Sequence, residues 1–418
     1  MPIPSSFRFV SLIAIVTFFV NFNSFAQFHP DSLSHIEVEG NDTDPFIILD
    51  GGKLNQVFYN PTSTSQNTLL LHLVGSIDNP NSTIQYPTMA ANNGFHCINL
   101  TYRNGVSGHA ACAASVDSNC HINYRKEIIE GINYSPEVTV NTASSINNRL
   151  IKLLEYLSLN YPSQNWAQYY TGSTILWNNI IVSGHSQGGG HAAVIAMTEP
   201  VKRVLMFASP NDYSDTLMMR ATWTSLPHVV PDSNYYAFNA LSDSVIDSWI
   251  QFEHSDALNL DNFGDTVNVD LTNSPYTDSR QLYTTQITPP LSILKLTHNI
   301  MIRDFETPLD STGIPVFECV WKYMLGIECA TTSINELQNE HNYKIFPNPT
   351  QDYIMIQSDA TSAENDQAVI KDIAGRHISS HSLKESNRIS MQHLTNGIYI
   401  VQIINQGTVV ASRKVVKD

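Results

Sequence analysis

Short apolar runs bounded by polar turns recur between residues 68 and 286, and such runs are typical of strands buried on both faces of a sheet. Residues 144–162 instead place apolar side chains three or four positions apart and end at a proline, which predicts an amphipathic helix. Strands that alternate with helices predict a mainly parallel sheet with helices on both faces, because parallel neighbours need crossover connections. The predicted strands are 68–75, 95–102, 178–183, 203–209, 235–241 and 280–286.

The pattern changes after residue 330, which divides the chain into an α/β domain at 27–330 and a smaller C-terminal part. The last helix of the first domain is predicted at 314–327. A polar linker at 331–342 then leads to short alternating runs over 343–418, which predict a small all-β sandwich. The residues of the last helix expected to face the sheet are Val316, Phe317, Val320, Trp321 and Met324.

The N-terminal 26 residues have the pattern of a secretory signal peptide. One cation, Arg8, precedes an apolar stretch from Phe9 to Val20, and small residues follow it. No later segment reaches about 18 apolar residues without charge, so we expect no transmembrane segment and a soluble exported protein.

The chain has 418 residues, of which 42% are hydrophobic, and a formal net charge of −16 at pH 7. Residues 27–330 hold 13 Lys and Arg against 29 Asp and Glu, so this region alone accounts for the net charge. Such a surface repels nucleic acid and anionic lipid, which argues against both as partners.

Export makes the five cysteines candidates for disulfides. Cys112 and Cys120 are close in a polar segment, and Cys319 and Cys329 flank the end of the predicted last helix. These pairings leave Cys97 as a buried thiol, and the alternative is that all five cysteines are unpaired. No cysteine or histidine spacing indicates a metal, and no cofactor is expected.

The sequence "GHSQG" at 184–188 fits G-x-S-x-G between a predicted strand and a predicted helix. The flanking glycines allow a sharp turn that lifts the hydroxyl of Ser186 to the carboxyl edge of the sheet. A serine hydroxyl is a weak nucleophile near neutral pH, so it needs a general base and a carboxylate that orients this base.

In this setting the first domain resembles the α/β-hydrolases, over most of residues 60–328. The resemblance implies the order serine, acid, histidine along the chain. His298, which lies beyond the last strand, is therefore the predicted base. His228 precedes the strand that should carry the acid, His254 is expected to be exposed on a helix, and His185 is expected to pack beside the pocket.

The acid predicted on the same grounds is Asp243, directly after the strand at 235–241. Asp212, one strand earlier, is the main competitor, and Asp247 is a third candidate.

The oxyanion that forms during acyl transfer needs two N–H donors. The resemblance implies the backbone of Gln187 as one donor and the loop at Gly75 and Ser76 as the other. Two segments, 104–137 and 211–234, are expected beside an open or partly covered cleft.

These residues together predict a serine hydrolase that cleaves carboxylic esters. Amide or peptide cleavage by the same triad is one alternative. A surface binding protein without catalysis is another, since a fold does not fix function.

The C-terminal part resembles the sorting domains of type IX secretion substrates. The resemblance is carried by "FPNPT" at 346–350, "KDIAGR" at 371–376, "LTNGIYIV" at 394–401 and the basic end "RKVVK". It implies that the type IX secretion machinery is a partner, that the protein passes through the periplasm to the cell surface or beyond, and that the domain is removed on the way.

Overall fold

The computed structural model describes residues 32–287, 296–329, 343–358, 366–372, 376–384, 386–405 and 408–418. The predicted signal peptide (1–26) and the whole of the predicted linker (331–342) lie outside these residues. The chain forms two compact units, Met1–Ile327 and Glu328–Asp418, which are described separately.

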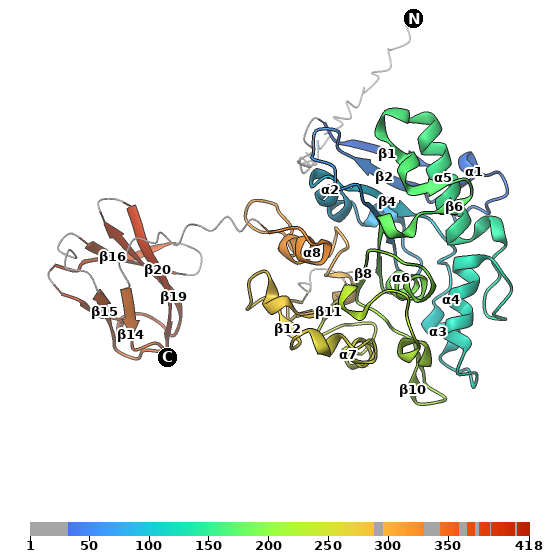
Figure 1. Ribbon diagram of the computed structural model, residues 1–418. Helices are drawn as coiled ribbons and strands as arrows, with labels where there is room; N and C mark the ends of the chain where they lie inside the picture. The colour runs from blue at the N-terminus through green and yellow to red at the C-terminus, as the bar shows by residue number, and fades with distance from the viewer. Residues whose placement is uncertain are drawn as a thin grey trace, which may run out of the picture. The chain divides into compact units, whose positions relative to one another are not determined.

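A mixed nine-stranded sheet forms the centre of the first unit among its described residues (Figure 1). Strands β4 to β13 pair in parallel, as expected, and each of the six predicted strands is present. Five have slightly shorter bounds than predicted, and the strand predicted at 178–183 begins and ends two residues later. The order across the sheet is β1 (Ser34–Val38), β2 (Asn55–Tyr59), β4 (His96–Leu100), β3 (Leu69–Leu73), β7 (Ile180–His185), β8 (Arg203–Phe207), β11 (Tyr235–Ala240), β13 (Gln281–Thr284) and β12 (Val267–Asn268).

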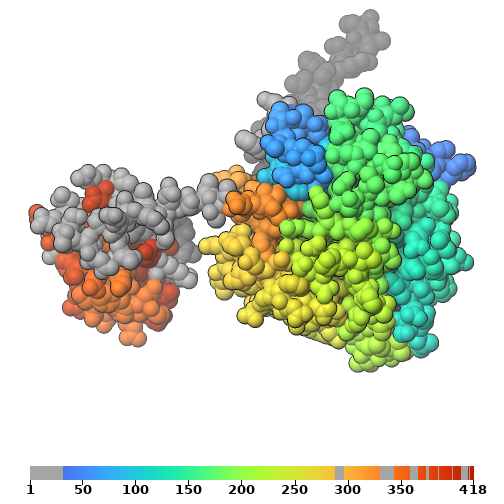
Figure 2. All heavy atoms as spheres, in the orientation of Figure 1, coloured from blue at the N-terminus to red at the C-terminus, as the bar shows by residue number. Residues whose placement is uncertain are grey.

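Two strands at one edge, β1 and β2, were not predicted. They pair antiparallel with each other, and β2 pairs antiparallel with β4, which makes the sheet mixed. The segment after the helix at 146–160 contacts this edge: Gln164 Nε2 donates to Ser34 Oγ at 3.5 Å. In the space-filling view, an early part of the chain in blue lies against a middle part in green (Figure 2).

Helices cover both faces of the sheet. Successive side chains of a strand point to opposite sides, so the apolar strands present apolar side chains on both faces, and both need to be covered. In β3, Leu69, Leu71 and Leu73 belong to one buried cluster, whereas Leu70 belongs to the other. The first cluster includes α4 (Cys120–Glu130), α5 (Ile146–Asn160) and α6 (Gln187–Thr198), and the second includes α2 (Gln85–Asn92) and α8 (Glu318–Leu325) (Figure 1). The remaining helices are α1 (Gly40–Thr43), α3 (Gly108–Cys112) and α7 (Ser248–Ala257).

The last predicted helix is shorter than expected at its N-terminal end. It begins at Glu318 instead of residue 314, so Val316 lies outside it and is 37% exposed. The other four residues expected to face the sheet are buried: Phe317, Val320, Trp321 and Met324.

The second unit is all-β, as predicted. A three-stranded antiparallel sheet contains β14 (Tyr343–Phe346), β15 (Tyr353–Ser358) and β18 (Arg388–Ser390). A four-stranded sheet contains β17 (His377–Ser382), β16 (Asp366–Asp372), β19 (Gly397–Asn405) and β20 (Thr408–Lys417). Side chains from both sheets share one core, which includes Ile354, Ile389, Ile370 and Val401.

Candidate active site

Ser186 occupies the single-residue turn between β7 and α6. Its backbone has φ 53° and ψ −117°, a positive-φ conformation that non-glycine residues rarely adopt. Glycines make the turn possible: a Cβ atom at Gly184 would overlap the backbone of Gly188, and one at Gly188 would overlap the carbonyl of Leu73 on β3. The tight packing holds the serine at the carboxyl end of the central strand.

Asp243 and His298 meet at the same edge of the sheet although 55 positions separate them. Asp243 follows β11, and His298 lies in a 3₁₀ turn, Thr297–Asn299, that follows β13 along the chain. His298 Nδ1 donates to Asp243 Oδ2 at 2.6 Å. Because a carboxylate only accepts, Nδ1 carries the proton and Nε2 is left as the acceptor that a general base needs.

The carboxylate of Asp243 is held on both oxygens. Its Oδ1 accepts from the backbone N–H groups of Val245 and Ile246 at 2.8 and 3.0 Å, while Oδ2 also accepts from Gln251 Nε2 at 2.9 Å. Burial raises the pKa of Asp243, but His298 and these donors outweigh it, so the pKa lies below its ordinary value. The group is therefore an anion near neutral pH.

Burial has the opposite effect on the base. It lowers the pKa of His298 below its ordinary 6.5, even though the hydrogen bond to Asp243 raises it. His298 is thus neutral near pH 7 and able to accept a proton.

The nucleophile and the base are not joined by a hydrogen bond among the residues that the structure describes. Ser186 Oγ accepts from Asn211 Nδ2 at 3.5 Å instead. Hydrogen bonds between catalytic groups are often long before substrate binds, so the missing hydrogen bond does not argue against Ser186 and His298 as nucleophile and base.

The predicted oxyanion loop lies against the Ser186 turn. A Cβ atom at Gly75 would stand 3.4 Å from Ser186 Cβ, and Ser76 Oγ donates to Gln187 Oε1 at 2.7 Å. The same Oε1 atom accepts from the backbone N–H of Gly108 at 3.0 Å. In the described part of the chain, the backbone N–H groups of Ser76 and Gln187 donate to no protein oxygen, so both remain available for an oxyanion.

Asp212, the competing acid, is occupied elsewhere. Its carboxylate is fully buried and accepts from Arg125 Nε at 2.6 Å and from Trp223 Nε1 at 2.8 Å. Burial raises the pKa of Asp212, but Arg125, His121 and His254 together bring it well below its ordinary value, so the group is an anion paired with the Arg125 cation. The third candidate, Asp247, is the residue before α7, and its Oδ2 accepts from Trp249 Nε1 at 3.4 Å.

The other histidines lie away from the acid. His228 Nδ1 contacts the hydroxyl of Tyr235 at 2.7 Å. The expectation that His254 is exposed was wrong: it is fully buried, and its Nε2 donates to the backbone oxygen of Asp212 at 2.9 Å. Helix α7 packs this face against the segment at 211–225, a contact that the short helical pattern did not indicate.

His185 is buried, and its ring lies next to that of His298, with the ring centroids 5.1 Å apart. Its Nε2 donates to the backbone oxygen of His298 at 3.0 Å, and its Nδ1 lies 3.7 Å from Asp78 Oδ2. Asp78 also lies 3.5 Å from Arg303 Nη1. Burial raises the pKa of Asp78, but His185 and Arg303 outweigh it and bring the pKa below its ordinary value.

Two buried amides at this edge, Asn211 and Gln251, were missed by sequence reasoning. Gln251 Nε2 donates to Asn211 Oδ1 at 3.2 Å as well as to Asp243 Oδ2. Because Asn211 donates to Ser186 Oγ, a chain of amides links the predicted acid to the predicted nucleophile. Gln251 looks like any polar residue of an amphipathic helix, so no sequence signal marked it.

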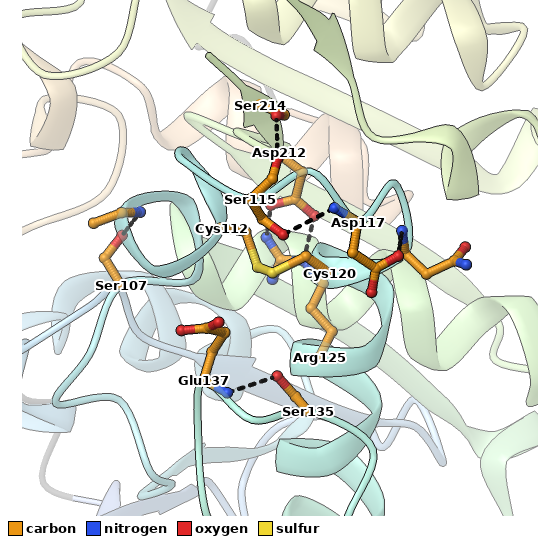
Figure 3. Close-up of a disulfide and its surroundings, with 12 residues drawn as sticks. Ser107, Cys112, Ser115, Asp117, Cys120, Arg125, Ser135, Glu137, Asp212 and Ser214 are labelled. Carbon is orange, nitrogen blue, oxygen red and sulfur yellow. Dashed lines mark hydrogen bonds and ion pairs between the residues drawn. A yellow bond between two sulfur atoms is a disulfide. The ribbon is translucent and has the colours of Figure 1, made fainter. Parts of the chain in front are cut away.

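Arg125 was also missed. It lies on α4 and is 2% exposed, and beyond Asp212 it donates from Nη1 to the backbone oxygen of Gln187 at 2.8 Å. Gly190 leaves room for its guanidinium, which a Cβ atom there would overlap. Arg125, paired with Asp212, therefore packs against the first turn of α6. Figure 3 shows the pair next to a disulfide.

The disulfide in Figure 3 joins Cys112 and Cys120, as predicted, and ties α3 to the start of α4. Cys319 and Cys329 are disulfide-bonded as well, and Cys97 is a buried free thiol. Within the described residues no group of three or more His, Cys, Asp or Glu is arranged to hold a metal ion. The described part of the chain also contains no helix with the length and apolar character to cross a bilayer.

Comparison with known proteins identifies the second unit. A family model described as a secretion system C-terminal sorting domain matches residues 344–418. No curated protein matches the chain. The C-terminal unit is therefore a type IX secretion sorting domain, which indicates export to the cell surface or the exterior.

Proposed function

We propose that the first unit is a secreted serine hydrolase of the α/β-hydrolase type that cleaves carboxylic esters. The observation that carries the proposal is the hydrogen bond of 2.6 Å between His298 Nδ1 and Asp243 Oδ2. It orients a neutral imidazole at the sheet edge where Ser186 is held in a strained turn. The order of these residues along the sheet, after β7, β11 and β13, also supports the proposal.

In the proposed reaction, Ser186 Oγ attacks the ester carbonyl carbon while its proton passes to His298 Nε2. The resulting oxyanion accepts from the backbone N–H groups of Gln187 and Ser76. The C–O bond to the alcohol then breaks, and the alcohol leaves with the proton from His298. Water repeats the two steps on the acyl-enzyme, releasing the carboxylic acid and restoring Ser186.

The first experiment measures hydrolysis of p-nitrophenyl esters by the wild type and by Ser186→Ala. Loss of such a nucleophile lowers kcat by about 10⁶, so we expect turnover to disappear. Ser158→Ala is the matched control, because Ser158 Oγ bonds only the backbone of its own helix, to Leu154 O at 2.8 Å. Turnover retained by Ser186→Ala would refute the proposed nucleophile.

Labelling with a fluorophosphonate, followed by mapping of the adduct, tests the same site without a chosen substrate. We expect the adduct on Ser186. A folded wild-type protein that takes up no label would favour a binding protein without catalysis. Peptide turnover faster than ester turnover would favour amide cleavage by the same three residues.

A further inference from the structure

The loop that carries the proposed oxyanion donor contains an unfavourable residue for its backbone shape. Asp78 N–H donates to the oxygen of Gly75 at 3.3 Å, which closes a four-residue turn with Ile77 in its third position. Ile77 has φ 59°. Glycine or asparagine is the usual choice at such a position, and a β-branched residue there is strained.

The strain persists because Asn104 holds this turn at three points. The backbone oxygen of Asn104 accepts from Ile77 N–H at 2.7 Å, and Asn104 Nδ2 donates to the oxygens of Gly75 and Asp78 at 2.8 and 2.9 Å. Asn104 is buried. Strained residues that the surrounding structure fixes in this way cluster at functional sites.

Packing does not explain the isoleucine, because Ile77 is 75% exposed. Val106 is 46% exposed and lies between Asn104, which holds the turn, and Gly108, whose N–H donates to Gln187. Ile77 follows Ser76, a proposed oxyanion donor, in the chain, and Val106 lies between two residues that contact the Ser76 loop and Gln187. Each of these exposed aliphatic residues therefore lies on a segment held beside the proposed donors.

We propose that Ile77, with Val106, contacts the acyl chain of the substrate and makes the enzyme selective for esters of aliphatic acids. The inference rests on the proposed function. The oxyanion oxygen and the acyl chain are both bonded to the carbonyl carbon of the substrate. When the backbone N–H of Ser76 binds this oxygen, the acyl chain begins close to Ser76 and extends over the residues next to it. Contact with these aliphatic side chains removes the apolar surface of the acyl chain from water, so it stabilises bound substrates with longer acyl chains more than those with short ones.

The test compares kcat/KM for p-nitrophenyl octanoate and p-nitrophenyl acetate, which share one leaving group. Ile77→Gly and Ile77→Asn both suit a positive φ, so the turn and the fold are expected to survive, with an unchanged or higher Tm. Loss of one well-covered aliphatic side chain should lower the octanoate-to-acetate ratio about tenfold or more. Ile77→Leu should retain most of the ratio.

Leu159→Ala is the matched control, because Leu159 is also an exposed aliphatic residue, at 81%, but it lies in the last turn of α5, outside both segments expected beside the cleft. We expect this control to leave the ratio unchanged. Equal losses for both esters, or the same change in the control, would overturn the inference. Wild-type turnover of neither ester would instead contradict the proposed function.

Discussion

Three residues with positive φ follow three neighbouring strands of the first unit. They are Ile77 after β3, Ser186 after β7 and Ala208 after β8, with φ of 59°, 53° and 49°. Parallel strands place these residues at one edge of the sheet. Local strain thus coincides with the edge where the acid and the base meet, as expected for a site whose geometry is imposed by its surroundings.

The proposed base predicts the acid limb of the pH profile. Catalysis needs neutral His298, so kcat/KM should fall as pH decreases through the pKa of this group. Burial lowers that pKa, and we therefore expect the midpoint below 6.5. Stopped assays with p-nitrophenyl acetate between pH 4 and pH 8 measure the midpoint.

Asp243→Asn provides the control for this pH profile. The carboxylate raises the pKa of His298, so its removal should move the midpoint to still lower pH and reduce kcat by about 10⁴. A wild-type midpoint above 6.5, or an unchanged midpoint in Asp243→Asn, would contradict the assigned pair.

The local sequence predicted the tight turn at Ser186 because this turn has a local cause, two glycines at fixed spacing. The choice of Asp243 and His298, which the structure brings into contact, also needed the chain order that the resemblance implies. Arg125 and Gln251 could not be predicted, since their partners, Asp212 and Asn211, lie 87 and 40 positions away. A buried cation and a buried amide are defined by such tertiary partners and not by their own neighbours in the chain.

At the scale of elements, the apolar runs predicted the parallel strands because these are buried on both faces and need no alternation. Strand β1 was missed because it lies at the edge and alternates between exposed and partly exposed side chains. Strand β2 is buried, but it begins with two polar residues, Asn55 and Gln56, and so lacks the apolar run of the predicted strands. The start of α8 was misplaced because Phe317, just before the helix, is buried like the helical residues that follow it.

The buried ion pair between Arg125 on α4 and Asp212, which packs against the start of α6, leads to a prediction about stability. Arg125→Met leaves the buried carboxylate of Asp212 without its cation. Breaking one side of a buried pair costs about 3–5 kcal/mol, so the free energy of unfolding should fall by that amount. Urea denaturation followed by tryptophan fluorescence measures the change.

A surface pair offers the matched control. Lys152 and Glu155 on α5 lie 2.8 Å apart with about a third of each side chain exposed, and Lys152→Met should cost less than about 1 kcal/mol. Adding Asp212→Asn to Arg125→Met should restore part of the lost stability, because no buried charge then remains. Equal costs for the two single variants would contradict a structural role for the Arg125 pair.

At the scale of the whole molecule, the net negative charge lies almost entirely in the first unit. Residues 27–330 carry the net −16, whereas residues 331–418 hold 8 cations and 9 anions and are nearly neutral. The sorting domain is matched by its family model, and the proposed catalytic residues all lie in the other unit. Export and catalysis are therefore expected to depend on different parts of the chain.

A chain that ends at residue 329 tests this separation. It retains both disulfides, the nine-stranded sheet and the proposed triad, so its ester turnover and Tm should match those of the full chain. In a host with type IX secretion it should stay in the periplasm, because the sorting domain is gone. Cell fractionation and assays of the medium measure both outcomes, with Ser186→Ala in the full chain as the reverse control, exported but inactive. A truncated protein that is exported, or one that is folded but inactive, would show that the two roles are not separable.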